Sequence, residues 1–260
     1  MLSQSSAYPP GDDAVQLRAR VHRELGAIEK SGTCDKIDYS TNVSWDELDE
    51  IRLLHTEWFP VEYHDDFFES IVTGTGFGGG DVVTVVASVG TNPRHIVGII
   101  TVAIKRDEKQ YNPTADLCTA LDINGNYTTA YILTLGVVDE LRGKGVGKEL
   151  LQRGIEKVQV SDPLCRLVYL HVIEYNEAAR KFYLRENFIQ FNRYKEFYFF
   201  NGRVFDGILL YRRIEENDRE RGVWRVTRWL YEKVRQIFQV IFTVKRPRKD
   251  DTDYTSSSLV

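Results

Sequence analysis

The feature that most constrains this chain is an apolar run that leads into a glycine-rich turn and then into an amphipathic segment. The run Thr129–Val138 has the β-branched content of a buried strand, and Val146–Val160 carries apolar residues at helical spacing. Between them lies Arg142-Gly143-Lys144-Gly145-Val146-Gly147. A strand, a turn and a helix in this order present free backbone N–H groups at a helix N-terminus, and such groups bind phosphate. The sequence therefore predicts a phosphate-binding turn in an α/β or α+β chain.

Two other kinds of phosphate site do not fit the order of the sequence. The turn lacks the Gly-Lys-Ser/Thr ending of a nucleoside triphosphate loop. The segment Gly74–Gly79 has the spacing of a dinucleotide fingerprint, but it follows an expected helix and enters an expected strand. Dinucleotide binding needs the reverse order, so Gly74–Gly79 is predicted to be an ordinary turn.

Helical and extended patterns alternate from Lys36 onwards, which predicts a mixed central sheet with helices on both faces. Ser44 is expected to cap a helix that ends near His55, with Glu47 at the capping-box position. The other expected elements are strands at Ile37–Tyr39, Val82–Val89, His95–Ile104, Leu167–Val172, Phe188–Phe191 and Val204–Arg213, and helices at Asp65–Thr73 and from Asn176 onwards.

A later segment carries a family resemblance. Asn176, followed by small residues, Phe182-Tyr183 and a closing Asn187-Phe188, is similar to the fourth helix of GNAT acetyltransferases. Together with the strand and its glycine-rich turn, this segment makes about Lys36–Ile214 resemble that family. The resemblance implies the GNAT fold and acetyl-CoA as the co-substrate.

Three segments are similar to a narrower group, the membrane-associated F-type N-terminal acetyltransferases: Trp58–Tyr63, Tyr131–Val138 and Tyr169–Val172. This resemblance implies Tyr131 and His171 as the catalytic pair. It also implies a peptide site lined by Tyr63, Leu133 and Tyr198, although the expected loop Tyr194–Phe199 is less tyrosine-rich and more charged than the family pattern. The implied acetyl-CoA contacts are Leu135, Gly136, Val137, Arg142, Gly143, Lys144, Gly145, Val146, Gly147, Lys148, Asn176, Tyr183, Leu184, Arg185 and Glu186.

A mechanism can be built on these positions. An α-ammonium group has a pKa of about 7.7–8.0, so a mild base such as histidine is enough to deprotonate it. Tyr131 and His171 are expected on neighbouring strands, where they can share one water molecule. Backbone N–H groups of Leu135–Val137 can polarise the acetyl carbonyl, and Tyr183 is a candidate to protonate the departing thiolate. Without the resemblance, a lone His or Tyr on a strand is more often a core residue.

The substrate side of the site is expected to carry one carboxylate and several aromatic rings. Glu62 near the entrance favours a cationic N-terminus, while Phe59, Tyr63 and Tyr198 cover the groove. A covered groove admits an extended N-terminal residue and hinders a mid-chain lysine. Hydrophobic cover over the core is the alternative role for these rings.

The charge is unevenly distributed along the chain. From Arg219 to Lys249, ten Lys and Arg residues stand against two Glu, a balance of +8 that leaves −12 for the rest of a chain of net charge −4. Apolar residues from Val223 to Val244 recur at helical spacing beside Trp224 and Trp229. Charges interrupt every window long enough to span a bilayer, which favours an amphipathic helix on an anionic membrane surface. The resemblance implies the cytosolic face of the Golgi. Packing on the chain's own domain is the alternative, and nucleic-acid binding is not expected.

The sequence is expected to divide into an N-terminal extension with a short helix (1–35), the GNAT domain (36–215), the basic helix (216–249) and a disordered tail (250–260). Cys34, Cys118 and Cys165 stand far apart and in no Cys/His spacing, so no disulfide framework and no metal site is expected. A monomer and a homodimer both agree with the sequence.

The expected activity is transfer of acetyl from acetyl-CoA to the free α-amino group of exposed protein N-termini that begin with Met. Acetylation of lysines, histone tails included, stays open because the same apparatus serves it. A third possibility is a non-catalytic acyl-CoA-binding membrane scaffold. The presence of both Tyr131 and His171 argues against that possibility.

Overall fold

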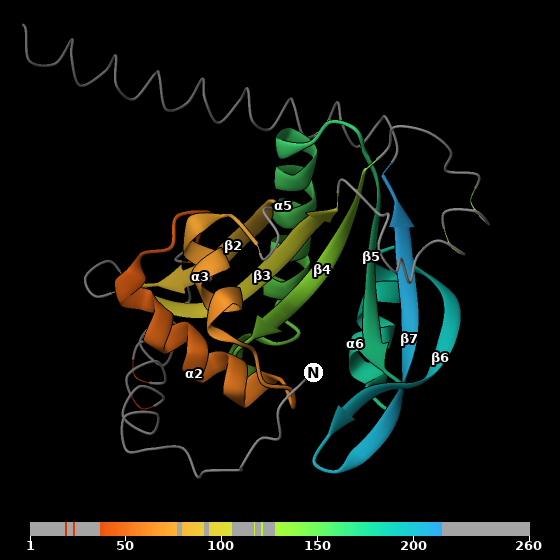
Figure 1. The fold of residues 1–260 in the computed structure, drawn as a ribbon. Coiled ribbons are helices and arrows are strands. Elements are labelled where there is room, and N and C mark those ends of the chain that lie inside the picture. Colours follow the sequence, from red (N-terminus) through yellow and green to blue (C-terminus); the bar gives the residue numbers. More distant parts are fainter. Residues whose placement is uncertain are drawn as a thin grey trace, which may run out of the picture. The chain divides into compact units, whose positions relative to one another are not determined.

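The computed structural model describes residues 37–76, 80–90, 94–105 and 128–214, together with the single positions Ala19, Arg23, Leu117 and Leu121. This part of the chain forms a mixed seven-stranded sheet in the order β1-β2-β3-β4-β5-β7-β6, which confirms the expected architecture (Figure 1). All neighbouring strands are antiparallel except β4 and β5. The strands are β1 (Asp38–Ser40), β2 (Val82–Val89), β3 (His95–Lys105), β4 (Thr128–Val137), β5 (Cys165–Ile173), β6 (Ile189–Phe200) and β7 (Arg203–Arg213).

The parallel pair β4–β5 separates part-way along its length. Its paired residues run from Thr128↔Cys165 to Tyr131↔Tyr169, and Figure 1 shows β4 turning away from β5 beyond that point. β4 stays paired with β3 as far as Val137. The other edge of β4 from Ile132 onwards therefore presents backbone N–H and C=O groups that a ligand or water must satisfy.

Helices lie on both faces of the sheet (Figure 1). α5 (Val146–Ser161) lies behind β2, β3 and β4, whereas α2 (Leu48–Trp58) and α3 (Asp65–Thr73) lie in front of them. α6 (Glu177–Arg185) follows β5. The buried side chains of these helices and of the central strands form one hydrophobic core, which supports the strands that carry the site.

The helix predicted to end near His55 is longer than expected. It opens with a 3-10 turn, η2 (Trp45–Glu47), whose Glu47 carboxylate accepts the Ser44 backbone N–H at 2.8 Å. α2 then runs to Trp58, where Phe59 takes an extended conformation. Pro60 explains this end, because a proline disfavours the helical conformation in the residue before it.

The strand predicted at Phe188–Phe191 is also longer, and the expected loop Tyr194–Phe199 is part of it. β6 runs to Phe200 and pairs with β7 on both sides of an irregularity between Tyr194 and Tyr198. Glu196 there has a φ of 54°, and its backbone N–H donates to the Asp206 carboxylate at 3.0 Å. The prediction was wrong because this bulge allows a charged stretch to stay within the hairpin.

Several expectations lie outside the described residues. They are the helix expected within residues 1–35, and the basic helix and tail over 216–260. Every element described above belongs to the unit Met1–Arg219. Among the described helices, none is both long and apolar enough to cross a membrane.

Candidate active site

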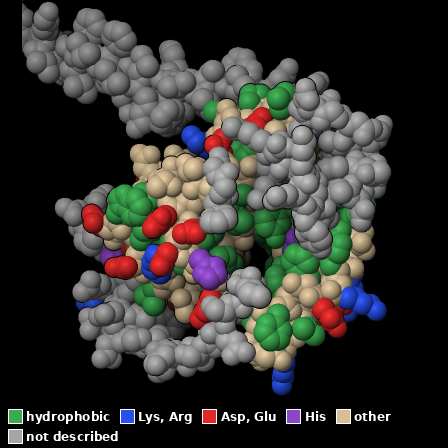
Figure 2. Space-filling view, in the orientation of Figure 1, with side chains coloured by type: hydrophobic (Ala, Val, Ile, Leu, Met, Phe, Trp, Pro, Cys, Tyr) green, Lys and Arg blue, Asp and Glu red, His purple; other side chains and the backbone are tan. Residues whose placement is uncertain are grey.

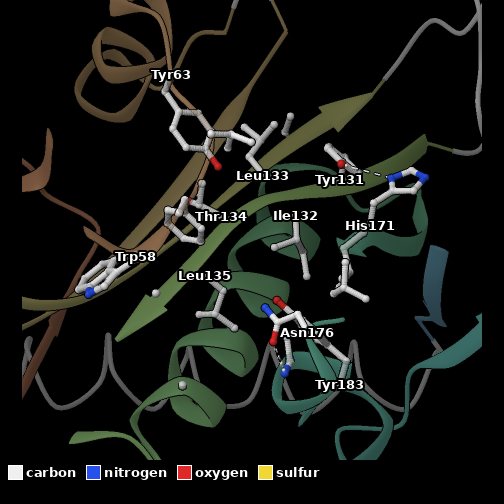
Figure 3. Close-up of a pocket in the computed structure, with 18 of the residues that line it drawn as sticks. Trp58, Tyr63, Tyr131, Ile132, Leu133, Thr134, Leu135, His171, Asn176 and Tyr183 are labelled. Atoms are coloured by element: carbon white, nitrogen blue, oxygen red, sulfur yellow. Dashed lines mark hydrogen bonds between the residues drawn. The ribbon is translucent and has the colours of Figure 1, made fainter. Parts of the chain in front are cut away.

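A pocket of about 1890 Å³ opens where β4 and β5 separate. β4 lines it from Tyr131 to Val137, with the loop between α2 and α3 beside one end of this segment and β5 and α6 across from it (Figure 3). Figure 2 shows hydrophobic side chains around the opening and acidic side chains gathered over α2 and α3. Residues far apart in the sequence thus meet at one hollow in the sheet.

Tyr131 of the predicted catalytic pair lies at the last paired position of β4 and β5, opposite Tyr169, and His171 lies two residues further along β5. The Tyr131 hydroxyl is 3.3 Å from Nδ1 of His171, so the two side chains hydrogen-bond directly rather than across the expected water (Figure 3). The Phe197 ring stacks on His171 with ring centroids 4.1 Å apart and planes 19° from parallel. Gly207 makes room for it, since a Cβ there would lie 2.8 Å from the Phe197 ring. The β6 bulge therefore covers one face of the imidazole.

Burial sets the charge of both members of the pair. It raises the pKa of Tyr131 to about 12 and lowers the pKa of His171 to about 4. Both side chains are therefore neutral near pH 7. Nε2 of His171 is buried and has no hydrogen-bond partner among the described residues. When Nδ1–H donates to the Tyr131 oxygen, Nε2 keeps its lone pair and can accept a proton.

The middle of β4 is irregular on the side of β3. Thr101 pairs with Thr134 and Val102 with Ile132, which leaves Leu133 as an extra residue in β4. Such a bulge bends a strand and turns its backbone groups out of the ladder. Leu133 and Leu135 lie in the pocket wall, and the β4 backbone there can donate to an acyl oxygen.

The predicted phosphate turn lies at the start of α5. Gly143 and Gly145 have φ values of 75° and 89°, which side chains rarely adopt, and nothing lies within 4 Å of a Cβ built on either. The first backbone N–H groups of α5 are thus reachable by an anion. Nε of Arg142 donates to the Val137 carbonyl at 3.0 Å and ties the turn to the end of β4.

The fourth predicted element, α6, lines the pocket opposite β4. Oδ1 of Asn176 accepts the Ala179 N–H at 3.0 Å and caps this helix. Tyr183 is buried, and burial raises the pKa of its phenol well above the ordinary value, which keeps it protonated. Lys148 of α5 lies 3.9 Å from the Glu186 carboxylate across the pocket.

Three of the predicted coenzyme contacts are not among the pocket-lining residues. Lys144 is exposed in the turn, and its backbone N–H donates to the Leu141 carbonyl at 3.4 Å. Val146 is buried in the core, and Leu184 is exposed. The pocket-lining predicted coenzyme contacts are Leu135, Gly136, Val137, Arg142, Gly143, Gly145, Gly147, Lys148, Asn176, Tyr183, Arg185 and Glu186.

All four predicted peptide-site residues line the same pocket. Glu62 is exposed and Tyr63 half-buried in the loop between α2 and α3, Leu133 is in β4, and Tyr198 is in β6. Burial raises the pKa of Tyr63 and of Tyr198 well above the ordinary value, so both phenols stay neutral. The other three residues, Tyr63, Leu133 and Tyr198, present apolar or uncharged groups to a substrate, and Glu62 presents a carboxylate.

The chain matches the family model described as the acetyltransferase (GNAT) family over residues 45–188. That segment contains β2 to β5, the glycine turn, α5 and α6. This chain is a GNAT-family acetyltransferase.

Two proteins similar in sequence to this acetyltransferase are named as acetyltransferases. The histone acetyltransferase MCC1 of Arabidopsis thaliana is 32% identical over 182 residues, 68% of this chain and 69% of that protein. N-alpha-acetyltransferase 60 of Danio rerio is 32% identical over 163 residues, 62% of this chain and 64% of that protein. The chain thus spans slightly less than two thirds of the Danio rerio protein.

Solved structures of an N-terminal acetyltransferase named NAA60 also match the fold of this chain. Arabidopsis thaliana NAA60 in complex with acetyl-CoA matches with a TM-score of 0.58 and 32% identity, over 68% of this chain and 98% of that one. The same protein in complex with a bisubstrate analogue has a TM-score of 0.58 and 31% identity, over 69% and 98%. The family resemblance and the fold class stated from the sequence are confirmed.

The residues of this acetyltransferase fit acetyl-CoA. The glycine turn offers helix N-terminal N–H groups to a pyrophosphate, with the side chains of Lys148 and Arg185 beside them in the same pocket. The free edge of β4 offers backbone groups to a pantetheine amide. The described residues contain no group of His, Cys, Asp and Glu suited to a metal ion.

Sequence reasoning missed two residues of the site. Phe197 was not singled out because its place on His171 depends on the β6 bulge, which no local pattern announces. His55 was treated as a helix end, yet it is buried and reaches Thr134 of β4 at 3.4 Å. A histidine in an otherwise apolar helix stripe was the one available indication, and it does not name the partner 79 residues away.

Proposed function

We propose that this acetyltransferase transfers acetyl from acetyl-CoA to the free α-amino group of protein N-termini, including those that begin with Met. The observation that carries the proposal is the contact of Tyr131 with His171, at the point where β4 and β5 part inside a GNAT pocket. The relatives named N-alpha-acetyltransferase 60 and the NAA60 complex with a bisubstrate analogue support it.

The pair can handle the proton of the amine. Acetyl-CoA supplies a thioester, and only the neutral form of an amine attacks it. An α-amino group with a pKa of about 7.7–8.0 is partly neutral at physiological pH. His171, with a pKa lowered to about 4 by burial, is too weak a base to deprotonate the free ammonium. It accepts the proton as the new C–N bond makes the nitrogen acidic, while Tyr131 holds the imidazole through Nδ1.

Other groups act on the acyl oxygen and on the leaving sulfur. Backbone N–H groups of Leu135–Val137 face negative charge that develops on the acyl oxygen. Tyr183 remains protonated because burial raises its pKa, so its hydroxyl can donate a hydrogen bond to the thiolate as the C–S bond breaks. The thiolate takes up a proton from solvent, and His171 returns the proton of the amine to solvent. Both roles are assigned to predicted site residues, and the support for them is that these residues line the same pocket.

The peptide side favours a chain end over an internal residue. Phe59, Tyr63 and Tyr198 line the pocket where a substrate enters, and Glu62 is exposed beside them. A carboxylate attracts a cationic N-terminus, and the rings leave room for one extended residue. Lysine acetylation, including that of histones, is the second candidate, because the Arabidopsis thaliana relative is named a histone acetyltransferase.

The proposed location is a cytosolic membrane surface, that of the Golgi by resemblance. The support is the apolar stripe from Val223 to Val244 and the local balance of +8 over Arg219–Lys249. Such a segment lies in a membrane interface with its basic residues near anionic headgroups. This segment lies outside the described residues.

A peptide panel tests the activity. Peptides with a free or a blocked N-terminus, each with and without an internal lysine, are incubated with acetyl-CoA, and the acetylated atom is located by mass spectrometry. Acetylation that requires the free N-terminus and ignores the lysine supports the proposal. Equal acetylation of blocked peptides that contain lysine would instead establish the second candidate.

A further inference from the structure

The last turn of α2 carries a histidine in the centre of an aromatic cluster. His55 is 1% exposed and lies on the sheet side of the loop that walls the peptide end of the pocket. It does not line the pocket itself. The rings around it, with centroid distances to His55, are Trp58 at 6.3 Å, Phe59 at 5.3 Å, Tyr63 at 5.5 Å, Phe67 at 5.4 Å and Phe68 at 5.5 Å.

His55 also begins a buried chain of hydrogen bonds. Its Nδ1 lies 2.8 Å from the Ile51 carbonyl, which can only accept, so Nδ1 carries the proton. Nε2 is then the acceptor and faces the Thr134 hydroxyl at 3.4 Å. That hydroxyl lies 2.6 Å from the hydroxyl of Thr101. One direction satisfies all three side chains: Thr101 donates to Thr134, and Thr134 donates to His55.

The buried chain of hydrogen bonds ends beside the β4 bulge at Leu133. Thr101 and Thr134 are the last pair before the register shift that leaves Leu133 unpaired. Both threonines are buried, Thr101 at 0% and Thr134 at 2% exposure. Buried hydrogen bonds have a direction and a length, so they add a specific alignment to the one that apolar packing gives. The polar chain therefore joins the aromatic loop to the irregular part of β4.

We propose that His55, Thr134 and Thr101 are positioning residues that hold the Leu133 bulge and the Trp58–Tyr63 loop in register with each other. They set the width of the peptide end of the pocket. His55 and Thr101 lie outside the pocket lining and act through Thr134, Leu133 and Tyr63. The inference rests on the proposed function for its kinetic readout. The glycine turn follows the far end of β4 from the bulge, so the pyrophosphate contacts should change least, although Trp58 packs against Gly136 on the way to that turn.

Thr101 gives the cleanest test because it is buried in β3 and does not itself line the pocket, whereas its partner Thr134 does. Thr101→Val removes the hydroxyl and keeps the shape, while Thr101→Ser keeps the hydroxyl. We expect Thr101→Val to lower kcat/KM for an N-terminal peptide by about 10–100-fold, the scale of a small misplacement of substrate. Affinity for acetyl-CoA, measured by calorimetry, should stay within about twofold. Thr101→Ser should restore most of the loss.

A second pair of variants tests the histidine. His55→Phe keeps a ring in the aromatic cluster but has no acceptor for Thr134, whereas His55→Gln offers an amide within reach of that hydroxyl. The proposal expects the peptide KM to rise with His55→Phe and to recover with His55→Gln. Val85→Ala is the matched control, because Val85 is buried in β2 opposite Ile100, on the other face of the sheet from Thr101, and its truncation opens a cavity away from these hydrogen bonds. Its kinetic constants per folded molecule should be those of the wild type.

Hydrogen exchange separates this inference from the proposed function. In Thr101→Val without any substrate, amides of residues 131–135 and 58–64 should exchange faster, and those of 142–148 should not. That readout stands even if the wild type acetylates no N-terminal peptide, an outcome that would refute the function alone. A folded Thr101→Val protein with wild-type exchange and wild-type peptide KM and kcat would overturn the positioning role. Equal kinetic losses in Val85→Ala would overturn it as well.

Discussion

The coenzyme end and the peptide end of the pocket differ in the groups that line them, backbone at the first and side chains at the second. At the coenzyme end, recognition depends on backbone: Gly143 and Gly145 take left-handed conformations, and α5 begins immediately after them. At the peptide end it depends on side chains, with the ring of Tyr63 on one wall and the rings of Phe197 and Tyr198 on the other. Between the two ends lie the β4 bulge and the Tyr131–His171 pair, which are proposed to act on the reacting groups.

The difference predicts how each end responds to change. A backbone site tolerates many side chains but fails when its conformation is lost, since the N–H groups then point elsewhere. A site of packed rings tolerates conservative exchange but depends on the support behind it. Coenzyme affinity and peptide kinetics should therefore be separable by mutation, and the following variants are chosen to break that separation.

The largest effect is expected from the pair between the two ends. His171→Ala and Tyr131→Phe should each lower kcat by about 10²–10⁴, the usual contribution of acid–base help. Acetyl-CoA affinity should change little, because neither side chain belongs to the glycine turn. Steady-state kinetics and calorimetry on the same samples measure both. Full turnover by both variants would show that the proton leaves by another route.

The next effect should appear in coenzyme affinity alone. Gly145→Val places a β-branched residue at a φ of 89°, a strain of about 1–3 kcal/mol that the turn can relieve by changing conformation. We expect acetyl-CoA to bind about 10–100-fold more weakly, because each 1.4 kcal/mol corresponds to about tenfold. Gly202→Val is the matched control, since Gly202 also has a positive φ and open space but lies in the β6–β7 turn. An equal loss in the control would remove the turn from the coenzyme site.

A smaller effect should follow removal of the ring that covers His171. Phe197→Ala lets water reach the imidazole, so the pKa of His171 should rise from about 4 toward the ordinary value of about 6.5. An NMR titration of the His171 ring protons measures this directly. kcat should fall less than with His171→Ala, because the base is retained. A midpoint that stays near 4 would mean that burial comes from β4 and β5 rather than from the β6 bulge.

The sequence predicted local elements better than contacts between distant segments, for a physical reason. α3 and β2 were predicted with the bounds that the structure has, because Asp65 and the left-handed Gly74 mark the ends of α3 and β-branched residues fill β2. The glycine turn is likewise a local pattern. The peptide end depends on contacts between distant segments, such as His55 with Thr134 and Phe197 with His171, which no window of sequence contains.

Acid should weaken the fold through the histidine behind the peptide end. Burial lowers the pKa of His55 to about 4 from an ordinary 6.5, so between these values the unfolded chain binds a proton that the folded chain does not. This contribution to stability is complete above pH 6.5 and is lost as the pH falls toward 4, by at most about 3 kcal/mol. The free energy of unfolding in urea at pH 7 and pH 4.5 measures it. Glutamine does not titrate in this range, so the free energy of unfolding of His55→Gln should fall less between pH 7 and pH 4.5. A fall as large as that of the wild type would contradict the assignment to His55.

The smallest kinetic effect, none at either end of the pocket, is expected when the basic segment is removed. Truncation after Ile214 keeps every described element and deletes the ten Lys and Arg residues of Arg219–Lys249. If that segment holds the enzyme on an anionic membrane through apolar and basic side chains, the truncated protein should lose binding to vesicles that contain phosphatidylserine. Its peptide KM and acetyl-CoA affinity should stay those of the full chain.

Exchange of Ile237, Phe238 and Ile241 for Asp should also abolish vesicle binding, without shortening the chain. High salt should release only part of the wild-type protein from the vesicles, since charge is one of two contributions to binding. Flotation of the truncated protein with the vesicles would refute the attachment, and unfolding on truncation would show instead that the segment packs on its own domain.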